Sequence, residues 1–235
     1  MPEPSLSDPA PGPLPQPLEC VELQTHPRPD ASIVWLHGLG ADGFDFVPLV
    51  RELQALGAPA ARYVFPHAPM RPVTINGGYV MRAWYDILNA ELDRREDPGG
   101  IRQSQAQIQT LIEREQARGT PHSRIVLAGF SQGGAITLQA GLRQSQSLAA
   151  LVVLSAYLPL AASAPSESTP AGRASPIFMA HGSDDTVIPL ARAQASRDAL
   201  GALGCRVQWH EYAMPHSVCE DEVRDLAQFL TEALK

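Results

Sequence analysis

The sequence has few cysteines, no long apolar run and a single lysine, Lys235. Cys20, Cys205 and Cys219 are too few and too scattered for a disulfide framework or a zinc site, which favours a reducing, cytoplasmic setting. No apolar run reaches the length of a membrane helix, so we expect no stable insertion into a membrane. The first residues also lack the basic start and apolar stretch of a secretory signal.

The balance of charge excludes a class of partner. The net charge is −7, which argues against a nucleic-acid-binding surface and is explained by solubility alone. Hydrophobic residues make up 44% and charged residues 18% of the chain, as in an ordinary globular protein. The length of 235 residues suits one domain with a sizeable core.

Proline separates the first residues from the rest. Prolines recur throughout residues 1–17, where they remove backbone N–H donors and exclude the centre of a sheet. We expect a flexible or polyproline-like tail, with a ligand for a proline-recognition module as the alternative. Residues 18–235 are predicted to form the folded domain that carries the chemistry.

Short apolar runs alternate with segments of helical period in this domain. Six runs predict buried strands: 33–36, 62–65, 125–128, 151–154, 177–180 and 207–209. Helical spacing predicts helices around 46–53 and 101–112, from about 132, over 190–203 and around 223–230. Strands without polar alternation, separated by helices, indicate a mainly parallel sheet covered on both faces. Ligands bind such sheets at the carboxyl ends of the strands, so reactive residues should directly follow strands.

The pentapeptide Gly129-Phe130-Ser131-Gln132-Gly133 lies between the third predicted strand and a helix. This context is typical of the nucleophile elbow of α/β-hydrolases, in which a strained turn exposes the serine above the sheet. The helix N-terminus behind the serine favours negative charge that develops there. Ser131 is therefore the predicted nucleophile, and a glycine-rich strand-to-helix turn is the alternative.

In this fold the acid and then the histidine follow the serine along the chain. Of seven histidines, only His210 and His216 follow a plausible acid. His210 lies within a predicted strand, whereas His216 lies in the loop between the last strand and the last helix, so His216 is the predicted base. Asp184 and Asp185 both follow the fifth strand. Local chemistry does not separate them, because one can orient His216 while the other caps the turn or the next helix.

A glycine-rich loop, His37-Gly38-Leu39-Gly40, follows the first predicted strand. Gly38 and Gly40 let the backbone approach a substrate closely. The backbone N–H groups of Leu39 and Gln132 are the predicted oxyanion donors. A flexible turn and a phosphate loop are the alternatives, but the Gly-Lys-Ser/Thr of a phosphate loop does not follow.

These motifs together resemble the phospholipase/carboxylesterase family, which contains bacterial carboxylesterases and acyl-protein thioesterases. The resemblance rests on segments 37–40, 66–69, 72–78, 83–87, 129–134 and 181–189 and on His216. It implies an α/β-hydrolase fold with a mainly parallel central sheet, helices on both faces and no large cap domain. Residues 81–83 and the spacer 159–176 depart from the family pattern at the rim of the expected pocket.

The resemblance also implies roles for individual residues. The triad would be Ser131, Asp185 and His216, so Asp185 is preferred to Asp184. Trp84 would lie near the acyl-binding cleft, with a buried core aromatic as the alternative. No metal or cofactor is implied, and a homodimer is expected of the family.

The predicted reaction is hydrolysis of a small-molecule acyl ester through an acyl-enzyme. We expect residues 159–176 to be loop and 88–100 a polar connection, so the cleft is open. An open cleft favours short- to medium-chain acyl esters, which makes a carboxylesterase the first hypothesis. An acyl-protein thioesterase or a lysophospholipase would use the same triad. A non-catalytic binding module with this fold is the alternative of another class.

Overall fold

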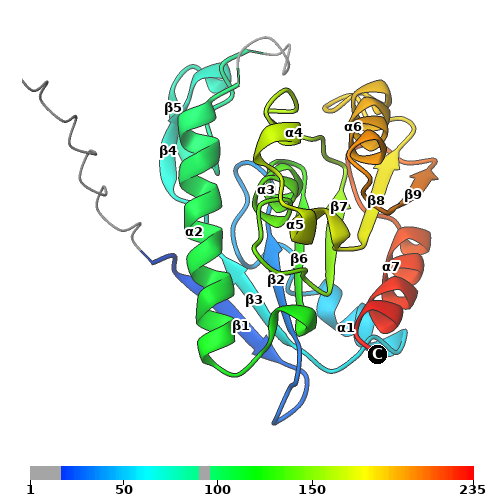
Figure 1. The fold of residues 1–235 in the computed structure, drawn as a ribbon. Helices are drawn as coiled ribbons and strands as arrows, with labels where there is room; N and C mark the ends of the chain where they lie inside the picture. Colours follow the sequence, from blue (N-terminus) through cyan, green and yellow to red (C-terminus); the bar gives the residue numbers. More distant parts are fainter. Residues whose placement is uncertain (1–16, 90–95) are drawn as a thin grey trace, which may run out of the picture.

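A seven-stranded sheet forms the centre of the computed structural model, which describes residues 17–89 and 96–235 (Figure 1). In spatial order the strands are β1 (Cys20–Gln24), β3 (Arg62–Pro66), β2 (Ser32–Leu36), β6 (Ile125–Phe130), β7 (Ala150–Leu154), β8 (Ile177–Gly182) and β9 (Val207–Tyr212). Only β1 runs antiparallel to its neighbour. The predicted mainly parallel sheet is confirmed, and each of the six predicted strands lies in it.

Helices cover both faces of this sheet. One face carries α2 (Pro98–Ala117), α3 (Gln132–Gly141) and α6 (Leu190–Ala202), and the other carries α1 (Leu49–Ala55) and α7 (Glu220–Ala233). These five elements match the predicted helices. The described residues contain no large cap domain, as expected for this α/β-hydrolase fold.

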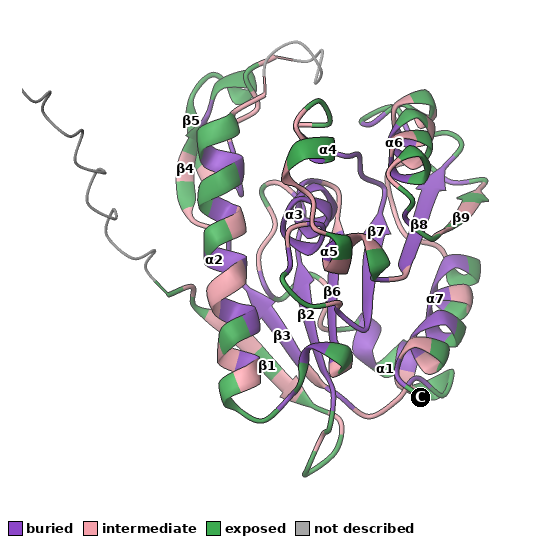
Figure 2. Cartoon of the chain, viewed as in Figure 1, coloured by how far each residue is buried: buried purple, intermediate pink, exposed green. Residues whose placement is uncertain are grey.

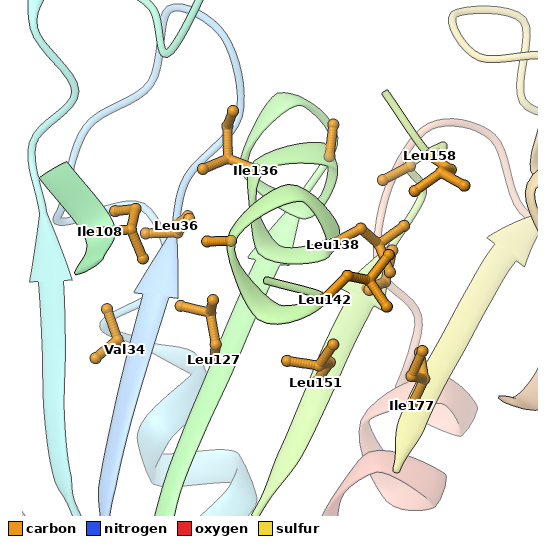
Figure 3. Packing of buried hydrophobic residues seen from close by; sticks show 14 of the residues in the cluster. Val34, Leu36, Ile108, Leu127, Ile136, Leu138, Leu142, Leu151, Leu158 and Ile177 are labelled. Atoms are coloured by element: carbon orange, nitrogen blue, oxygen red, sulfur yellow. The ribbon is translucent and has the colours of Figure 1, made fainter. Parts of the chain in front are cut away.

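Alternating side chains of the central strands divide the core in two. Val34, Leu127 and Leu151 point toward α2 and α3, where they meet Ile108 and Leu138 (Figure 3). The intervening strand residues pack against α1 and α7. The four central strands are therefore buried on both faces, while β1 and β9 at the edges are partly exposed (Figure 2). Because side chains on both faces of these strands are buried, the sequence of each central strand is a continuous apolar run.

Three strands were not predicted from the sequence. They are β1 and a two-stranded ribbon of β4 (Met70–Val73) and β5 (Tyr79–Arg82), with a 3₁₀ turn, η1 (Thr74–Asn76), between its strands. Their residues are mostly exposed or half-buried, so no continuous apolar run marks them. The ribbon follows β3 and lies close to the carboxyl ends of the central strands (Figure 1).

The spacer 159–176 is not simply a loop, so that expectation was wrong. It contains two short helices, α4 (Ala164–Glu167) and α5 (Pro170–Ala174), which both have proline in the first turn. Thr169 caps α5, since its hydroxyl oxygen accepts a hydrogen bond from Gly172 N at 2.8 Å. Helices of four and five residues carry too little periodicity to be seen in a sequence.

Two further predictions concern regions at the edge of the described chain. The proline-rich tail lies outside the described residues except for Pro17, which is exposed, and part of the connection 88–100 lies outside them too. Among the helices described, none combines the length and apolar character needed to cross a membrane.

Candidate active site

Ser131 occupies the sharp turn between β6 and α3. Its backbone has φ of 55° and ψ of −120°, a conformation that is strained for a residue other than glycine. The Ser131 N–H donates to Leu154 O on β7 at 2.9 Å, which holds the turn against the sheet. Gly133 allows the turn to be this tight, because a Cβ atom there would lie 2.3 Å from Leu36 O at the end of β2.

A chain of hydrogen bonds links three side chains that the sequence analysis singled out. Ser131 Oγ lies 2.9 Å from His216 Nε2, and His216 Nδ1 lies 2.7 Å from Asp185 Oδ2. A carboxylate only accepts hydrogen bonds, so the proton of the neutral ring lies on Nδ1 and Nε2 is free to accept from the serine. His216 follows β9 and Asp185 follows β8, so all three residues meet at the carboxyl ends of parallel strands.

The environment of the two aspartates differs sharply. Asp185 is 6% exposed, and its Oδ1 accepts hydrogen bonds from Val187 N at 2.8 Å and Ile188 N at 2.9 Å. Asp184 is exposed to solvent. The structure therefore brings Asp185 to His216 and leaves Asp184 at the surface.

A buried histidine that the sequence analysis did not assign, His181, supports the same loop. Its Nε2–H donates to Ile188 O at 2.8 Å and lies 3.3 Å from Asp185 Oδ2. Burial lowers the pKa of His181, so its ring is neutral at neutral pH. The imidazole thus closes the 182–188 loop back onto β8.

Leu39 and Gln132 line one cleft together with Ser131 and His216. Neither backbone N–H donates to an acceptor within the described part of the chain. The Gln132 side chain points the other way, where its Oε1 accepts from Trp84 N at 2.8 Å and its Nε2 donates to Tyr85 O at 2.7 Å. Two residues with unpaired N–H groups thus line the cleft that holds the serine.

The three residues predicted to contact substrate differ in their position relative to the cleft: they are Trp84, Gly38 and Gly40. Trp84 is fully buried, does not line the cleft, and donates its indole N–H to His37 O at 2.9 Å. Its position is that of a core aromatic that supports the glycine loop from behind. Gly38 lines the cleft, whereas Gly40 does not and adopts a φ of 77°, which favours glycine.

The cleft itself has a volume of about 490 Å³ and mostly apolar walls. Its apolar lining includes Leu39, Ile75, Ile87, Val187 and Ile188. Ile75 and Val187 are 43% and 58% exposed, so they mark its mouth. Such a lining suits an acyl chain.

Two tyrosines add a polar feature to this cleft. The hydroxyl groups of Tyr85 and Tyr157 lie 2.9 Å apart, and the Arg192 guanidinium lies 3.9 Å from the centre of the Tyr157 ring. Burial raises the pKa of both tyrosines, so both hydroxyls are protonated at neutral pH. Neither tyrosine was predicted as a site residue from the sequence: Tyr85 belongs to segment 83–87 but was given no role there, and Tyr157 lies outside the recognised motifs.

His210, the competing histidine, lies elsewhere. Its ring stacks on Phe178 at a centroid distance of 4.8 Å, and its Nδ1 lies 3.3 Å from Asp225. It does not line the cleft. Over the described ranges, no three or more His, Cys, Asp or Glu side chains are arranged to hold a metal ion.

Comparison with known proteins gives consistent results. The phospholipase/carboxylesterase family model matches residues 19–234. Acyl-protein thioesterase 1 of Neurospora crassa is 40% identical over 219 residues, which cover 88% of each chain. The protein of the same name from Mycosarcoma maydis is 37% identical over 222 residues, 88% of this chain and 92% of its own. The crystal structure of Arabidopsis thaliana SOBER1 has a TM-score of 0.82 at 29% identity, covering 87% of this chain and 99% of that chain.

Proposed function

This chain belongs to the phospholipase/carboxylesterase family, and on that premise we propose that it hydrolyses acyl thioesters with Ser131 as nucleophile. It is a hydrolase of the esterase or thioesterase kind. The observation that carries the proposal is the continuous hydrogen-bonded chain from Ser131 through His216 to Asp185. Ser131 and His216 line an apolar cleft, so a bound acyl group can place its carbonyl carbon next to the serine.

Proton transfer follows from the geometry of the His216 ring. At 2.9 Å its Nε2 is within reach of the Ser131 proton as the oxygen attacks the acyl carbonyl. The ring then carries two protons, and the Asp185 carboxylate at 2.7 Å stabilises that cation and fixes the ring orientation.

Charge on the attacked carbonyl oxygen requires donors that are already in place. The N–H groups of Leu39 and Gln132 are proposed to bind this oxyanion, and such donors are worth about 10²–10³ in rate each. Collapse of the tetrahedral intermediate releases the thiol and leaves an acyl group on Ser131. Water, deprotonated by His216, then attacks the acyl-enzyme and restores the serine.

The choice of thioesters over oxyesters rests on the relatives. Both curated relatives above are named acyl-protein thioesterases, so they support the thioesterase hypothesis better than the carboxylesterase hypothesis placed first by sequence. A thiol with a pKa of about 8.5 is also a far better leaving group than an alcohol and needs less protonation by His216. An oxyester hydrolase with the same triad remains the second candidate, supported by the family description.

The test compares an S-acyl cysteine peptide with the matched O-acyl serine peptide. We expect wild-type protein to cleave the thioester with the higher kcat/KM. Ser131→Ala should lower turnover by about 10⁶, since removal of a nucleophile has this effect. The control is Ser166→Ala, an exposed serine on α4, which should behave as wild type.

Three outcomes would contradict the proposal in different ways. Retained turnover in a folded Ser131→Ala variant would exclude this serine as nucleophile. A clear preference for the oxyester would restore the carboxylesterase hypothesis. Absence of both activity and fluorophosphonate labelling in the wild-type protein would favour a non-catalytic binding module.

A further inference from the structure

The glycine loop begins with His37, a buried histidine that does not belong to the hydrogen-bonded series of Ser131, His216 and Asp185. His37 directly follows β2, is 2% exposed and does not line the cleft. Its two ring nitrogens each have a backbone partner: Nδ1 lies 2.7 Å from Gly38 O, and Nε2 lies 3.0 Å from Ala68 N. The ring therefore connects the start of the glycine loop to the backbone at Ala68.

These two partners define the protonation state of the ring. A backbone N–H only donates, so Nε2 of His37 accepts from Ala68 and carries no proton. The proton of the neutral ring therefore lies on Nδ1, where it is donated to the Gly38 carbonyl. Burial lowers the pKa of His37 to about 4, against the raising effects of the Gly38 carbonyl and Asp42. His67 and Arg82 lower it further, so this tautomer persists at neutral pH.

The Gly38 carbonyl belongs to the same peptide group as the Leu39 N–H. In a planar trans peptide these two groups point in opposite directions, so fixing one fixes the other. The Gly38 carbonyl is held by the ring and also accepts from Ala41 N at 3.3 Å. The Leu39 N–H has no acceptor in the described part of the chain, and Leu39 shares the cleft with Ser131.

We propose that His37 is a positioning residue: its Nδ1–H holds the Gly38 carbonyl so that the Leu39 N–H faces the cleft beside Ser131. The inference rests on the proposed function, because it gives the Leu39 N–H a role only if Ser131 attacks an acyl carbonyl. The backbone of His37 is held as well, since its carbonyl accepts the Trp84 indole N–H. Rigid donors of this kind need no reorganisation during the reaction.

Two substitutions of similar size separate the two hydrogen bonds of the ring. Asparagine places its amide near Nδ1, so His37→Asn keeps a donor for Gly38 O and loses the contact with Ala68. Glutamine places its amide near Nε2, so His37→Gln keeps an acceptor for Ala68 N and loses the donor. We expect His37→Gln to lower kcat about 10²-fold with KM within about threefold, because a displaced oxyanion donor acts on the transition state. His37→Asn should stay within about tenfold of wild type.

A tetrahedral adduct supplies a second readout. A trifluoromethyl ketone bound to Ser131 carries the oxyanion, so its affinity should fall in His37→Gln in parallel with kcat. Binding of the acid product should hardly change. The control is His122→Gln, a buried histidine in η2 (His122–Arg124) before the amino end of β6, which should leave both readouts unchanged.

The outcomes are decisive in either direction. Equal losses of kcat in His37→Gln and His37→Asn would show a merely structural role, and wild-type turnover in His37→Gln would also overturn the proposal. If His37→Gln does not fold, a folded His37→Asn with a loss above 10²-fold overturns it. The proposed function is tested separately: it would be contradicted if wild-type protein hydrolysed thioesters no faster than Ser131→Ala.

Discussion

The proposed site has two halves. The relay half is formed by the linked side chains of Ser131, His216 and the buried Asp185. The oxyanion half is formed by the backbone N–H groups of Leu39 and Gln132, two residues that line the cleft. The relay half is linked internally, by hydrogen bonds of 2.9 and 2.7 Å. The oxyanion half has no internal link, and its two N–H groups have no acceptor within the described residues. Its order comes from residues behind it.

This difference decides how each half responds to substitution. In the relay half, one substitution removes one chemical group, so the effect on rate is direct. In the oxyanion half no side chain performs the chemistry, so the donors move only when a supporting residue changes. Substitutions in the relay half should therefore lower turnover more than substitutions that act on the oxyanion half.

Asp185→Asn should give the largest of these effects, a loss of about 10⁴ in kcat. The asparagine amide can donate to His216 Nδ1, which moves the ring proton to Nε2 and prevents it from accepting the Ser131 proton. The measurement is steady-state turnover of the thioester at neutral pH.

The neighbouring aspartate supplies the control for this prediction. Asp184→Asn changes an exposed carboxylate and should leave turnover within about twofold. Equal losses in the two variants would remove the distinction between the relay half and its surroundings.

Gly133→Ala should disturb the oxyanion half while the relay side chains are unchanged. The added Cβ would lie 2.3 Å from Leu36 O and 2.6 Å from His37 O, so the end of β2 and the loop after it must move. We expect a loss of about 10² in kcat and about 1–3 kcal/mol of stability. Turnover and thermal unfolding measured on one preparation separate the two effects.

A glycine with free space around it controls for the added methyl group. At Gly201 on α6 a Cβ atom would meet nothing within 4 Å, so Gly201→Ala should raise stability slightly and leave turnover alone. Full activity in Gly133→Ala would show that the loop tolerates displacement and that the oxyanion half does not need rigid support.

Glu222→Gln should have the smallest effect on turnover and a distinct effect on stability. Glu222 lies in the first turn of α7 and is fully buried, and its carboxylate has no side-chain hydrogen-bond partner among the described residues. Burial raises the pKa of Glu222 to about 8. Only the Cys219 backbone opposes this shift, whereas Asp185 accepts two backbone hydrogen bonds, from Val187 and Ile188.

The sign of the pH dependence follows from that shift. The unfolded chain loses this proton near its ordinary pKa of about 4.3, while the folded chain keeps it to about 8, so stability falls as pH rises between these values. Glu222→Gln should remove a fall on the order of a few kcal/mol, giving a higher Tm than wild type at pH 8 and a similar Tm at about pH 4.5. Glu220→Gln, an exposed residue of the same turn, should show no such difference. Parallel Tm curves for wild type and Glu222→Gln would contradict this.

The contrast between the halves also explains what the sequence could predict. Ser131, His216 and the acid loop lie directly after apolar runs, and parallel strands bring their carboxyl ends together, so the relay could be proposed from order alone. Local chemistry left Asp184 and Asp185 equivalent, because their difference is burial, which depends on the contact with β8 and His216.

The supports of the oxyanion half carry no such pattern. Trp84 and His37 act through a hydrogen bond between residues far apart in sequence, and the Tyr85–Tyr157 pair joins two unrelated loops. The β4–β5 ribbon near the cleft is too exposed to leave an apolar run. Tertiary contacts of this kind appear only once the chain is folded.

The parallel register of the sheet has a consequence for how the molecule reaches its active form. Ser32 on β2 pairs with Ile125 on β6, and no hairpin joins these two central strands. Such pairing must close a long loop before it gains any contact energy, which makes the topology slow to fold. Leu39 and Ser131 follow these same two strands, so the proposed oxyanion donor meets the proposed nucleophile only after that closure. If the proposed mechanism holds, hydrolysis requires completed pairing of β2 with β6, and partly folded chains are inactive.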